Sequence, residues 1–445
     1  NFMIKIYRLS GVLAIMLLLS FSNAKAQQIW TLKDCIDYAY SNNLSIKQQE
    51  LSLKEAQNNI LASKLDFLPS LNWSVNHNMS WGRSVNINDL AIIKDHLSQS
   101  TSTSVSAGVT LFAAMNKHKA LKSSKNKLKI AQQDIEKLKN DIYIAICKAY
   151  LQILLNYQID SVARESYNSV KEQVAKTEKL VDAGSQAYSS LLEIKAQLAT
   201  EKVQLVSANN NVQTSLLELA QLLDLENYYS FRIAVPKGNN SAMATVPSVD
   251  EIYSQSLNLP QIKRAELSLQ ESTLQHKIAK GAAYPSINFS AGYATYYSNG
   301  SDAAFFRQFN ENRSPSIGFG LSIPIFNNWR NNTQIRNSKL AVENSQIELD
   351  KAKQNLFKEI QQAHNDALAY YQKYIAATEN KKLSAESFNQ TKGKFDLGMV
   401  NATDFIVAKT NLFKAESECY QALYQYIFQL IILDYYAGKK FNGVL

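Results

Sequence analysis

Four segments of the chain alternate bulky apolar side chains with small polar ones. In SLNWSVNHNMSW (residues 70–81) the odd-numbered positions are Leu, Trp, Val, His, Met and Trp, and the even-numbered positions are all Ser or Asn. Successive side chains of a strand point to opposite faces, so this pattern predicts a strand between two different media. Related alternation predicts strands near residues 69–82, 101–113, 284–297 and 314–326.

The polar faces of these strands contain Ser, Gly, Asn and Thr but not the Lys and Glu of a water-exposed sheet. A half-buried sheet in a soluble sandwich would also alternate. However, aromatic residues gather toward the strand ends, as in the girdle of a membrane barrel: Trp73, Trp81, Phe112, Tyr293, Tyr296, Phe326 and Trp329. We therefore expect lipid on the apolar side, a water-filled lumen on the other, and extracellular loops at Gly82–Ser100 and Ser298–Arg313.

Four strands are too few to close a membrane barrel. An open sheet edge in lipid leaves unpaired backbone groups, each of which costs several kcal/mol. The smallest single-chain membrane barrels have about eight strands, so closure requires two or three copies of the chain. The strand count therefore predicts an oligomer.

The remaining sequence predicts long helices near residues 115–182, 187–224, 330–395 and 401–437. Only 7 Pro and 14 Gly occur in 445 residues, which leaves few helix breaks. Apolar residues recur every seventh position, for example Leu121, Leu128, Ile135, Ile142 and Ala149, and later Phe405, Leu412, Cys419, Tyr426 and Leu433. Sustained heptads predict coiled-coil packing of helix pairs, with the stripes as structural core.

The chain contains an internal duplication. LPSLNWSVN (residues 68–76) returns as YPSINFSAG (284–292) at an offset of 216, and VDAGSQAYSSLLEIK (181–195) returns as FDLGMVNATDFIVAK (395–409) at an offset of 214. We therefore divide the mature chain into repeats 27–240 and 241–445, joined in the polar stretch Val235–Pro247.

The first 26 residues resemble a secretory signal peptide, because Lys5 and Arg8 precede a short apolar run that leads into Ala24-Lys25-Ala26. Their removal takes away three basic residues and lowers the formal charge from +9 to +6, which demands no nucleic-acid partner. The densest basic stretch is Asn116–Lys129. Its charges are scattered around a predicted helix, which favours a solvated face over a phosphate-binding patch.

Candidate chemistry is sparse in this sequence. The three cysteines (Cys35, Cys147 and Cys419) form no C-x-x-C pair, and in an exported protein their odd number argues against a disulfide framework. The five histidines are dispersed without a metal-binding spacing, and we find no Walker, nucleophile-elbow or dinucleotide motif. We therefore expect no enzyme activity, no cofactor and no metal site.

The arrangement resembles the TolC-type outer-membrane efflux family over essentially the whole mature chain. The matching segments are TLKDCIDYAYSNN (31–43), the LPSL and YPSI strand starts, and the turns KLVDAGSQAYSSLLEIK and KFDLGMVNATDFIVAK. The resemblance implies a homotrimer with a twelve-stranded barrel in the outer membrane of a Gram-negative bacterium and a twelve-helix barrel reaching through the periplasm. It also implies a passive exit duct in a tripartite efflux or secretion system, with an inner-membrane pump and a periplasmic adaptor (membrane fusion) protein as partners.

The resemblance places the two glycine-centred turns at the periplasmic tip, where the adaptor docks, and assigns Gly184, Gly398 and Asn401 to it. It also suggests an acidic gate at Asp404, with Glu193 as a second candidate. The residues themselves favour a simpler role, because Asn401 to Asp404 and Ser190 to Glu193 both look like helix N-caps followed by an acid at N3. The alternative function is a structural or adhesive trimeric coiled-coil envelope protein without transport, which would need no small polar strand faces.

Overall fold

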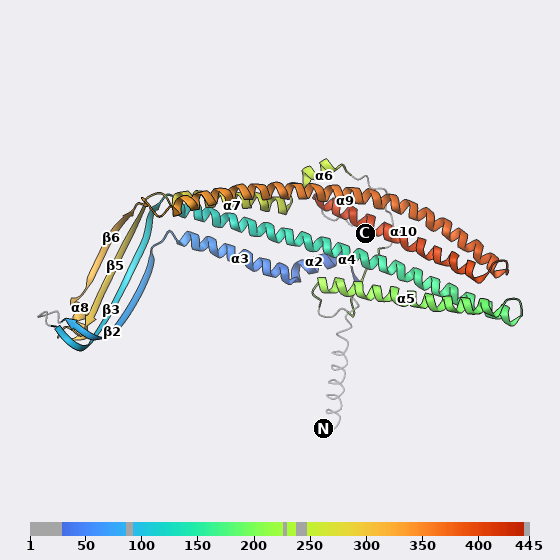
Figure 1. Ribbon diagram of the computed structural model, residues 1–445, viewed down its shortest axis with the longest axis horizontal. Coiled ribbons are helices and arrows are strands. Elements are labelled where there is room, and N and C mark those ends of the chain that lie inside the picture. The colour runs from blue at the N-terminus through green and yellow to red at the C-terminus, as the bar shows by residue number, and fades with distance from the viewer. Residues whose placement is uncertain (1–28, 86–91, 226–228, 237–246, 440–445) are drawn as a thin grey trace, which may run out of the picture. The chain divides into compact units, whose positions relative to one another are not determined.

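The computed structural model describes residues 29–85, 92–225, 229–236 and 247–439 (Figure 1). The predicted signal peptide, residues 86–91 of the first predicted loop and most of the predicted joint between the repeats lie outside these residues. The chain forms two compact units. The helical unit contains Asn1–Lys47, Lys137–Leu259 and Asn355–Leu445, and the sheet unit contains Gln48–Glu136 and Pro260–Gln354. Each unit draws on both sequence repeats, so the repeats are not separate compact domains.

The sheet unit is built on one antiparallel sheet of four strands in the order β2-β3-β5-β6. These are β2 (Ser70–Val85), β3 (Ile92–Ala113), β5 (Ser286–Ser298) and β6 (Ser314–Ser322). The preceding helices are α3 (Leu44–Leu65) before β2 and α7 (Pro260–Gly281) before β5. β2 and β6 each have one neighbour in the sheet and therefore form its two edges.

The hairpin of β2 and β3 extends beyond the predicted strands. Pairs such as Trp81 with Leu97 and Gly82 with His96 continue the ladder into the segment Gly82–Ser100, which was expected to be a loop. The side-chain pattern missed this extension because Lys94 and Asp95 interrupt the apolar alternation, whereas ladder hydrogen bonds use only the backbone. The second expected loop also contains regular structure, the short helix α8 (Phe305–Glu311).

β6, by contrast, is shorter than predicted. It ends at Ser322, although the alternating pattern continues to residue 326. Pro324 follows two residues later, and proline has no N–H to donate to a ladder. The last four residues of the predicted strand therefore belong to the connection to the next helix.

The duplication predicted from the sequence is visible in the bounds of the helices. Adding 214 to the bounds of α4 (Asn116–Asp182) gives those of α9 (Arg330–Asp396), and the same shift relates α5 (Tyr188–Leu222) to α10 (Ala402–Tyr436). The rare left-handed backbone repeats as well. Ala114 and Met115, with φ of 50° and 61°, correspond to Asn328 and Trp329, with φ of 55° and 63°. Both strand-to-helix connections thus use the same two-residue left-handed turn.

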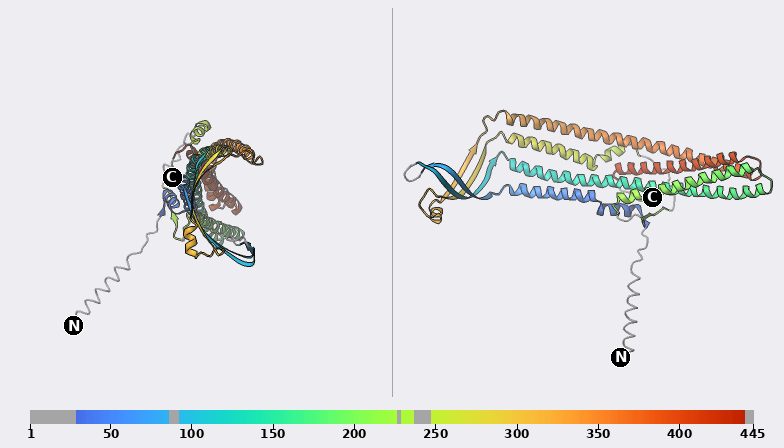
Figure 2. Two further views of the ribbon diagram at one scale, coloured as in Figure 1. Left: turned by 90° about the vertical axis from the view of Figure 1, so that its left-hand side faces the viewer. Right: turned by 60° about the horizontal axis from the view of Figure 1, so that its bottom comes forward.

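Long helices form the core of the helical unit, where α4 and α5 make one hairpin and α9 and α10 a second (Figure 2). The predicted heptad stripe of α10 is buried along its whole length, from Phe405 to Leu433. A stretch of α4 is apolar enough to cross a membrane by composition, but it includes Ile146, Ile153 and Leu154, which lie in this core. Packing between helices therefore accounts for its hydrophobicity.

Short elements complete the helical unit. β1 (Ile29–Trp30) pairs in parallel with β4 (Arg232–Ile233), and α2 (Leu32–Asn42) and α6 (Val249–Ser256) are amphipathic helices. Thr31 caps α2 in a complete capping box with Asp34, whose carboxylate accepts hydrogen bonds from the backbone and the hydroxyl of Thr31. Cys35 and Cys147 lie in the same buried cluster, and both are free thiols, as is Cys419.

Candidate functional site

The sheet separates an apolar face from a small polar face, as the alternation predicts. Register pairs Trp73 with Val105, and Val105 with Tyr293, so these bulky side chains share one face. This face is open: Trp73 is 75% exposed and Phe319 is 73% exposed in the single chain. An apolar surface that spans four strands is not tolerated in water and indicates contact with lipid or with another protein.

The few polar groups on the apolar face bond to one another. The indole N–H of Trp73 donates to the hydroxyl of Thr103 over 2.9 Å, and that hydroxyl donates in turn to the carbonyl of Ser74 over 3.3 Å. A ring nitrogen of His77 lies 2.8 Å from the hydroxyl of Thr101. Because these groups already have partners inside the sheet, they lose little when water is absent.

The opposite face is lined by hydroxyls, amides and glycines. Ser74 and Ser104 lie directly across from each other, and their hydroxyls are 2.8 Å apart. Gly292 pairs with Ser106 and Ser316, and a Cβ added to this glycine would lie 3.1 Å from the Ser316 hydroxyl. The face is therefore polar and without charged side chains on its paired positions from 70 to 80 and from 98 to 110.

The structure places the residues of the predicted aromatic girdle on different faces of the sheet. Tyr296 pairs with Ser102, so it lies on the small polar face and not with Trp73, Trp81 and Tyr293. Phe112 reaches the apolar face because a bulge after Thr110 removes Leu111 from the ladder and pairs Phe112 with Ile287. Phe326 and Trp329 are exposed in the connection that follows β6.

The two predicted tip glycines end the long helices of the helical unit in the same way. Gly184 has φ of 71° and Gly398 has φ of 72°. After α9, the Gly398 amide donates to the carbonyl of Phe395 over 3.0 Å, and the Met399 amide donates to the carbonyl of Lys394 over 2.9 Å. The Gly184 turn repeats both bonds, so each is a Schellman cap, in which glycine supplies the left-handed residue.

The two helices that follow these turns begin differently. Asn401 is the N-cap of α10, and its side-chain oxygen accepts a hydrogen bond of 2.8 Å from the Asp404 amide, which confirms the predicted cap with an acid at N3. The equivalent prediction for Ser190 and Glu193 is wrong. α5 starts at Tyr188 with Ala187 as its N-cap and no side-chain cap, so Ser190 lies within the first turn of the helix.

Both acids of the candidate gate, Asp404 and Glu193, are exposed in the single chain. Ion pairs lie close by in sequence: Lys176 on α4 is 3.3 Å from Asp396 on α9, and Lys195 on α5 is 3.1 Å from Glu178 on α4. The first pair joins the two hairpins and the second joins the helices of one hairpin. All four side chains are substantially exposed, so each pair contributes at most about 1 kcal/mol.

A buried charge in the helical unit escaped the sequence analysis. Lys409 on α10 is 6% exposed, and its ammonium lies 4.9 Å from the ring centroid of Phe388 on α9. Burial lowers the pKa of Lys409, against the opposing effect of Glu201, Glu416 and Glu165. The sequence spacing could have predicted this burial. Lys409 lies four residues after Phe405 and three before Leu412, which places it on the buried stripe of the helix.

Glu201 on α5 is the buried carboxylate among these acids, with 2% exposure. One of its oxygens accepts a hydrogen bond of 2.7 Å from the side chain of Gln197, and the other has no hydrogen-bond partner. Buried polar atoms without partners also occur on Gln173 and Thr177 of α4. Some buried polar atoms between the two hairpins therefore lack hydrogen bonds, unlike the atoms of an apolar core, which need none.

The described residues contain no group of three His, Cys, Asp or Glu side chains arranged to hold a metal ion. Comparison with known proteins identifies the family of the chain. The family described as "Outer membrane efflux protein" matches residues 35–224 and again 252–439, which together make up most of the chain.

Two relatives illustrate the match in sequence. The chain is 22% identical over 401 residues to the cation efflux system protein CusC of Escherichia coli K12, covering 86% of this chain and 80% of that protein. It is 22% identical over 398 residues to the outer membrane protein TolC of Vibrio cholerae, covering 88% of this chain and 86% of that protein.

Solved structures show the same fold. A crystal structure of CusC has a TM-score of 0.78 at 18% identity and covers 92% of both chains. The CmeC outer membrane channel of Campylobacter jejuni has a TM-score of 0.78 at 16% identity and covers 92% of this chain and 85% of its own. The chain therefore belongs to the outer membrane efflux protein family and is a TolC-like efflux channel protein of the outer membrane.

Proposed function

We propose that three copies of this chain close into one passive exit duct. The observation that carries the proposal is the four-stranded sheet, whose edges β2 and β6 lack a second neighbour while its apolar face is exposed. Three such sheets joined edge to edge give a twelve-stranded barrel with no free edge in lipid. The small polar faces then line the lumen, and the long helices of the three chains form a twelve-helix barrel in the periplasm.

We further propose that the duct serves a tripartite export system. The protein contains no energy-coupling motif in its sequence, so an inner-membrane pump supplies the energy and a periplasmic adaptor connects the two. The turns at Gly184 and Gly398 are the docking points for that adaptor, and Asn401 fixes the start of the helix beside the second turn. Three copies of Asp404, with Glu193, form the candidate acidic gate.

Two adjacent residues of β3 give a matched test of the duct. Ser104 lies on the small polar face and Val105 on the apolar face. We expect a charged thiol reagent to change the single-channel conductance of the purified Ser104→Cys protein in planar bilayers and to leave that of Val105→Cys unchanged. The native cysteines are buried and provide a low background.

The same preparation tests assembly. Mass measurement of the detergent-solubilised complex should give a trimer, and a stable monomer would refute closure by oligomerisation. A trimer without conductance would instead favour the structural or adhesive envelope protein. Equal effects of the reagent at both positions would contradict the assignment of the lumen to the small polar face.

A further inference from the structure

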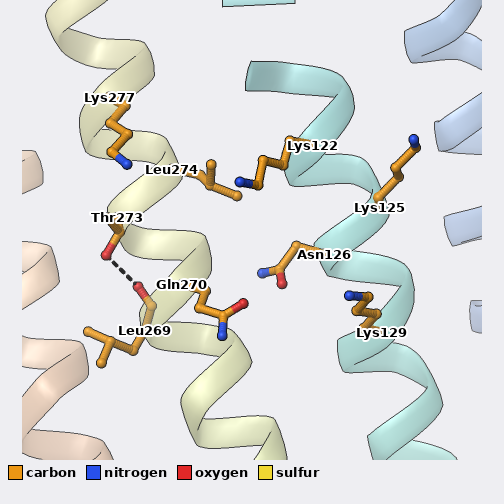
Figure 3. Close-up of a pocket in the computed structure, with 9 residues that line it drawn as sticks. All are labelled: Lys122, Lys125, Asn126, Lys129, Leu269, Gln270, Thr273, Leu274 and Lys277. Carbon is orange, nitrogen blue, oxygen red and sulfur yellow. Dashed lines mark hydrogen bonds between the residues drawn. The ribbon is translucent and has the colours of Figure 1, made fainter. Parts of the chain in front are cut away.

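A basic groove lies between α4 and α7 in the sheet unit. It encloses about 560 Å³ and is lined by Lys122, Lys125, Asn126 and Lys129 of α4 and by Leu269, Gln270, Thr273, Leu274 and Lys277 of α7 (Figure 3). Lys122 extends from α4 toward the space between the two helices, Lys125 extends away from it, and Lys277 runs along α7 toward Thr273. The stretch Asn116–Lys129 thus does not simply scatter its charges, because Lys122 and Lys129 line the same groove as Lys277 of α7.

Among the described residues, no carboxylate forms an ion pair with the ammonium group of Lys122, Lys125, Lys129 or Lys277. Neighbouring lysines do form ion pairs, since Lys117 lies 3.9 Å from Asp66 and Lys127 lies 3.9 Å from Glu271. Two lysines nearby on α4 thus have an acid within reach, whereas the lysines of the groove do not.

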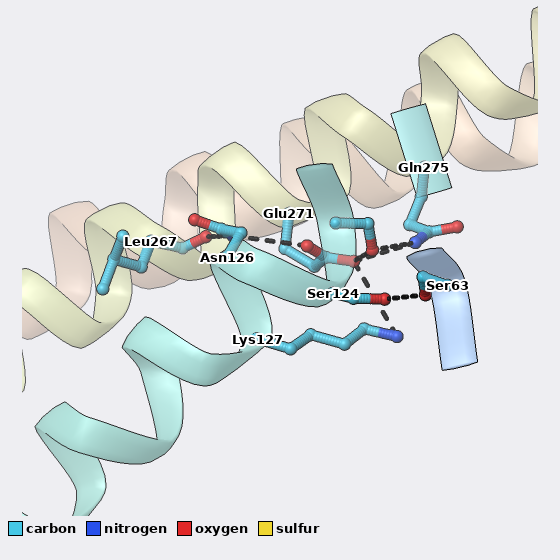
Figure 4. A network of polar contacts seen from close by, with 8 residues as sticks. Ser63, Ser124, Asn126, Lys127, Leu267, Glu271 and Gln275 are labelled. Carbon is cyan, nitrogen blue, oxygen red and sulfur yellow. Dashed lines mark hydrogen bonds and ion pairs between the residues drawn. The ribbon is translucent and has the colours of Figure 1, made fainter. Parts of the chain in front are cut away.

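Glu271 of α7 lies beside the groove and already has several partners. Its carboxylate accepts hydrogen bonds from the hydroxyl of Ser123 and from the side-chain amides of Asn126 and Gln275, and it attracts Lys127 (Figure 4). This network fixes α7 against α4, and the partners of both carboxylate oxygens are groups other than the groove lysines. Ammonium groups gathered without an acid repel one another, and an anion relieves that repulsion.

The lining of the groove mixes apolar and polar side chains. Leu269 and Leu274 are apolar, Asn126 and Gln270 carry amides, and the Thr273 hydroxyl donates to the carbonyl of Leu269 over 2.9 Å. Ammonium and amide groups beside leucines fit a ligand that carries both a negative group and hydrocarbon. Phosphate on a lipid headgroup has this chemistry, whereas a fully hydrated small anion would leave the leucines uncovered.

The groove also lies at a suitable level below the sheet. Lys122 is six residues after the start of α4 at Asn116, and Lys277 is four residues before the end of α7 at Gly281. At 1.5 Å per residue these distances are about 9 Å and 6 Å. The headgroup layer on each side of a bilayer is about 5–8 Å thick, and lysine stems extend toward it, so the upper rim is within reach of phosphate groups.

We propose that this groove binds the phosphate of an anionic phospholipid in the periplasmic leaflet. The inference rests on the proposed membrane barrel, which sets the level of the headgroups. Lys122 and Lys277 contact the phosphate from the two helices, and Lys129 adds long-range attraction from below. Such a lipid would tie α4 to α7 at the point where the helices leave the membrane.

Native mass spectrometry of the detergent-purified complex tests this proposal, with phosphatidylglycerol and phosphatidylcholine added in equal amounts. The test variant is Lys122→Gln/Lys129→Gln/Lys277→Gln. The matched control is Lys47→Gln/Lys54→Gln/Lys358→Gln, which removes the same charge from exposed lysines on α3 and α9 that lie far from the sheet ends of these helices. We expect wild-type and control proteins to prefer phosphatidylglycerol, and the groove variant to lose about fivefold in binding for each ammonium that contacts the phosphate.

A second arm separates lipid from free phosphate. Inorganic phosphate is titrated against each protein and followed by ³¹P line broadening. Broadening that requires the groove lysines, without a lipid preference that requires them, would keep the phosphate site and overturn the lipid source. Equal lipid binding by the groove and control variants, with no phosphate effect, would overturn the site altogether. Conductance measured on the same samples shows whether the channel itself is intact, so failure of the duct is distinguished from failure of the groove.

Discussion

The turn at Gly398 offers the sharpest test of how the long helices end. Gly398 adopts φ of 72°, and a Cβ added there would meet no atom within 4 Å. Substitution by alanine therefore introduces no clash, and the only penalty is the left-handed backbone conformation. That conformation costs a residue with a Cβ about 1–2 kcal/mol.

The same chain provides a control that differs only in backbone conformation. Gly393 lies within α9, five residues earlier, and an added Cβ would also meet no atom within 4 Å. There the helix favours alanine over glycine by about 0.5–1 kcal/mol. Gly398→Ala should thus destabilise the turn, whereas Gly393→Ala should stabilise the end of the helix.

Hydrogen exchange of the amides at positions 398 and 399 measures this change in turn stability directly, because both amides donate hydrogen bonds in the Schellman cap. A loss of 1–2 kcal/mol should speed exchange about 5–30-fold in Gly398→Ala. Gly398→Asn should fall between alanine and wild type, since asparagine tolerates the left-handed region. Exchange that is unchanged in Gly398→Ala, or that rises equally in Gly393→Ala, would refute the explanation.

Three further predictions concern charge and thiols. Asp404→Asn, alone or with Glu193→Gln, should raise conductance or weaken block by divalent cations in planar bilayers without affecting assembly; unchanged values would leave Asp404 as a capping residue only. Burial raises the pKa of Cys35 to about 12 and that of Cys147 to about 11. At pH 8 both thiols should therefore react slowly with a disulfide reagent until the protein is unfolded. Fast labelling of the native protein would contradict this. Burial lowers the pKa of Lys409, so the unfolded chain binds the proton of this lysine more tightly than the folded protein does. Stability against denaturant should therefore rise as the pH increases toward the usual lysine pKa of about 10.4. Lys409→Met should abolish that rise.

The sequence by itself determined the features that depend on periodicity and on local backbone rules. Alternation identified the sheet faces at Trp73 and Ser104, because neighbouring strand residues must point opposite ways. The heptads of α10 identified its buried stripe, because positions seven apart return to the same side of a helix. Gly398 was predictable as the C-terminal cap of one helix and Asn401 as the N-cap of the next, because each acts on residues within five positions of itself.

Only the tertiary structure decided what depends on neighbours that are distant in sequence. The bulge that moves Phe112 to the apolar face arises from pairing with β5, and the length of the β2–β3 hairpin arises from backbone bonds that no side-chain pattern encodes. Lys277 joins Lys122 and Lys129 across two helices, although more than 140 residues separate them in sequence. Electrostatic interaction depends on distance in space, so lysines that read as a solvated face of one helix become one wall of a basic groove when a second helix packs beside it.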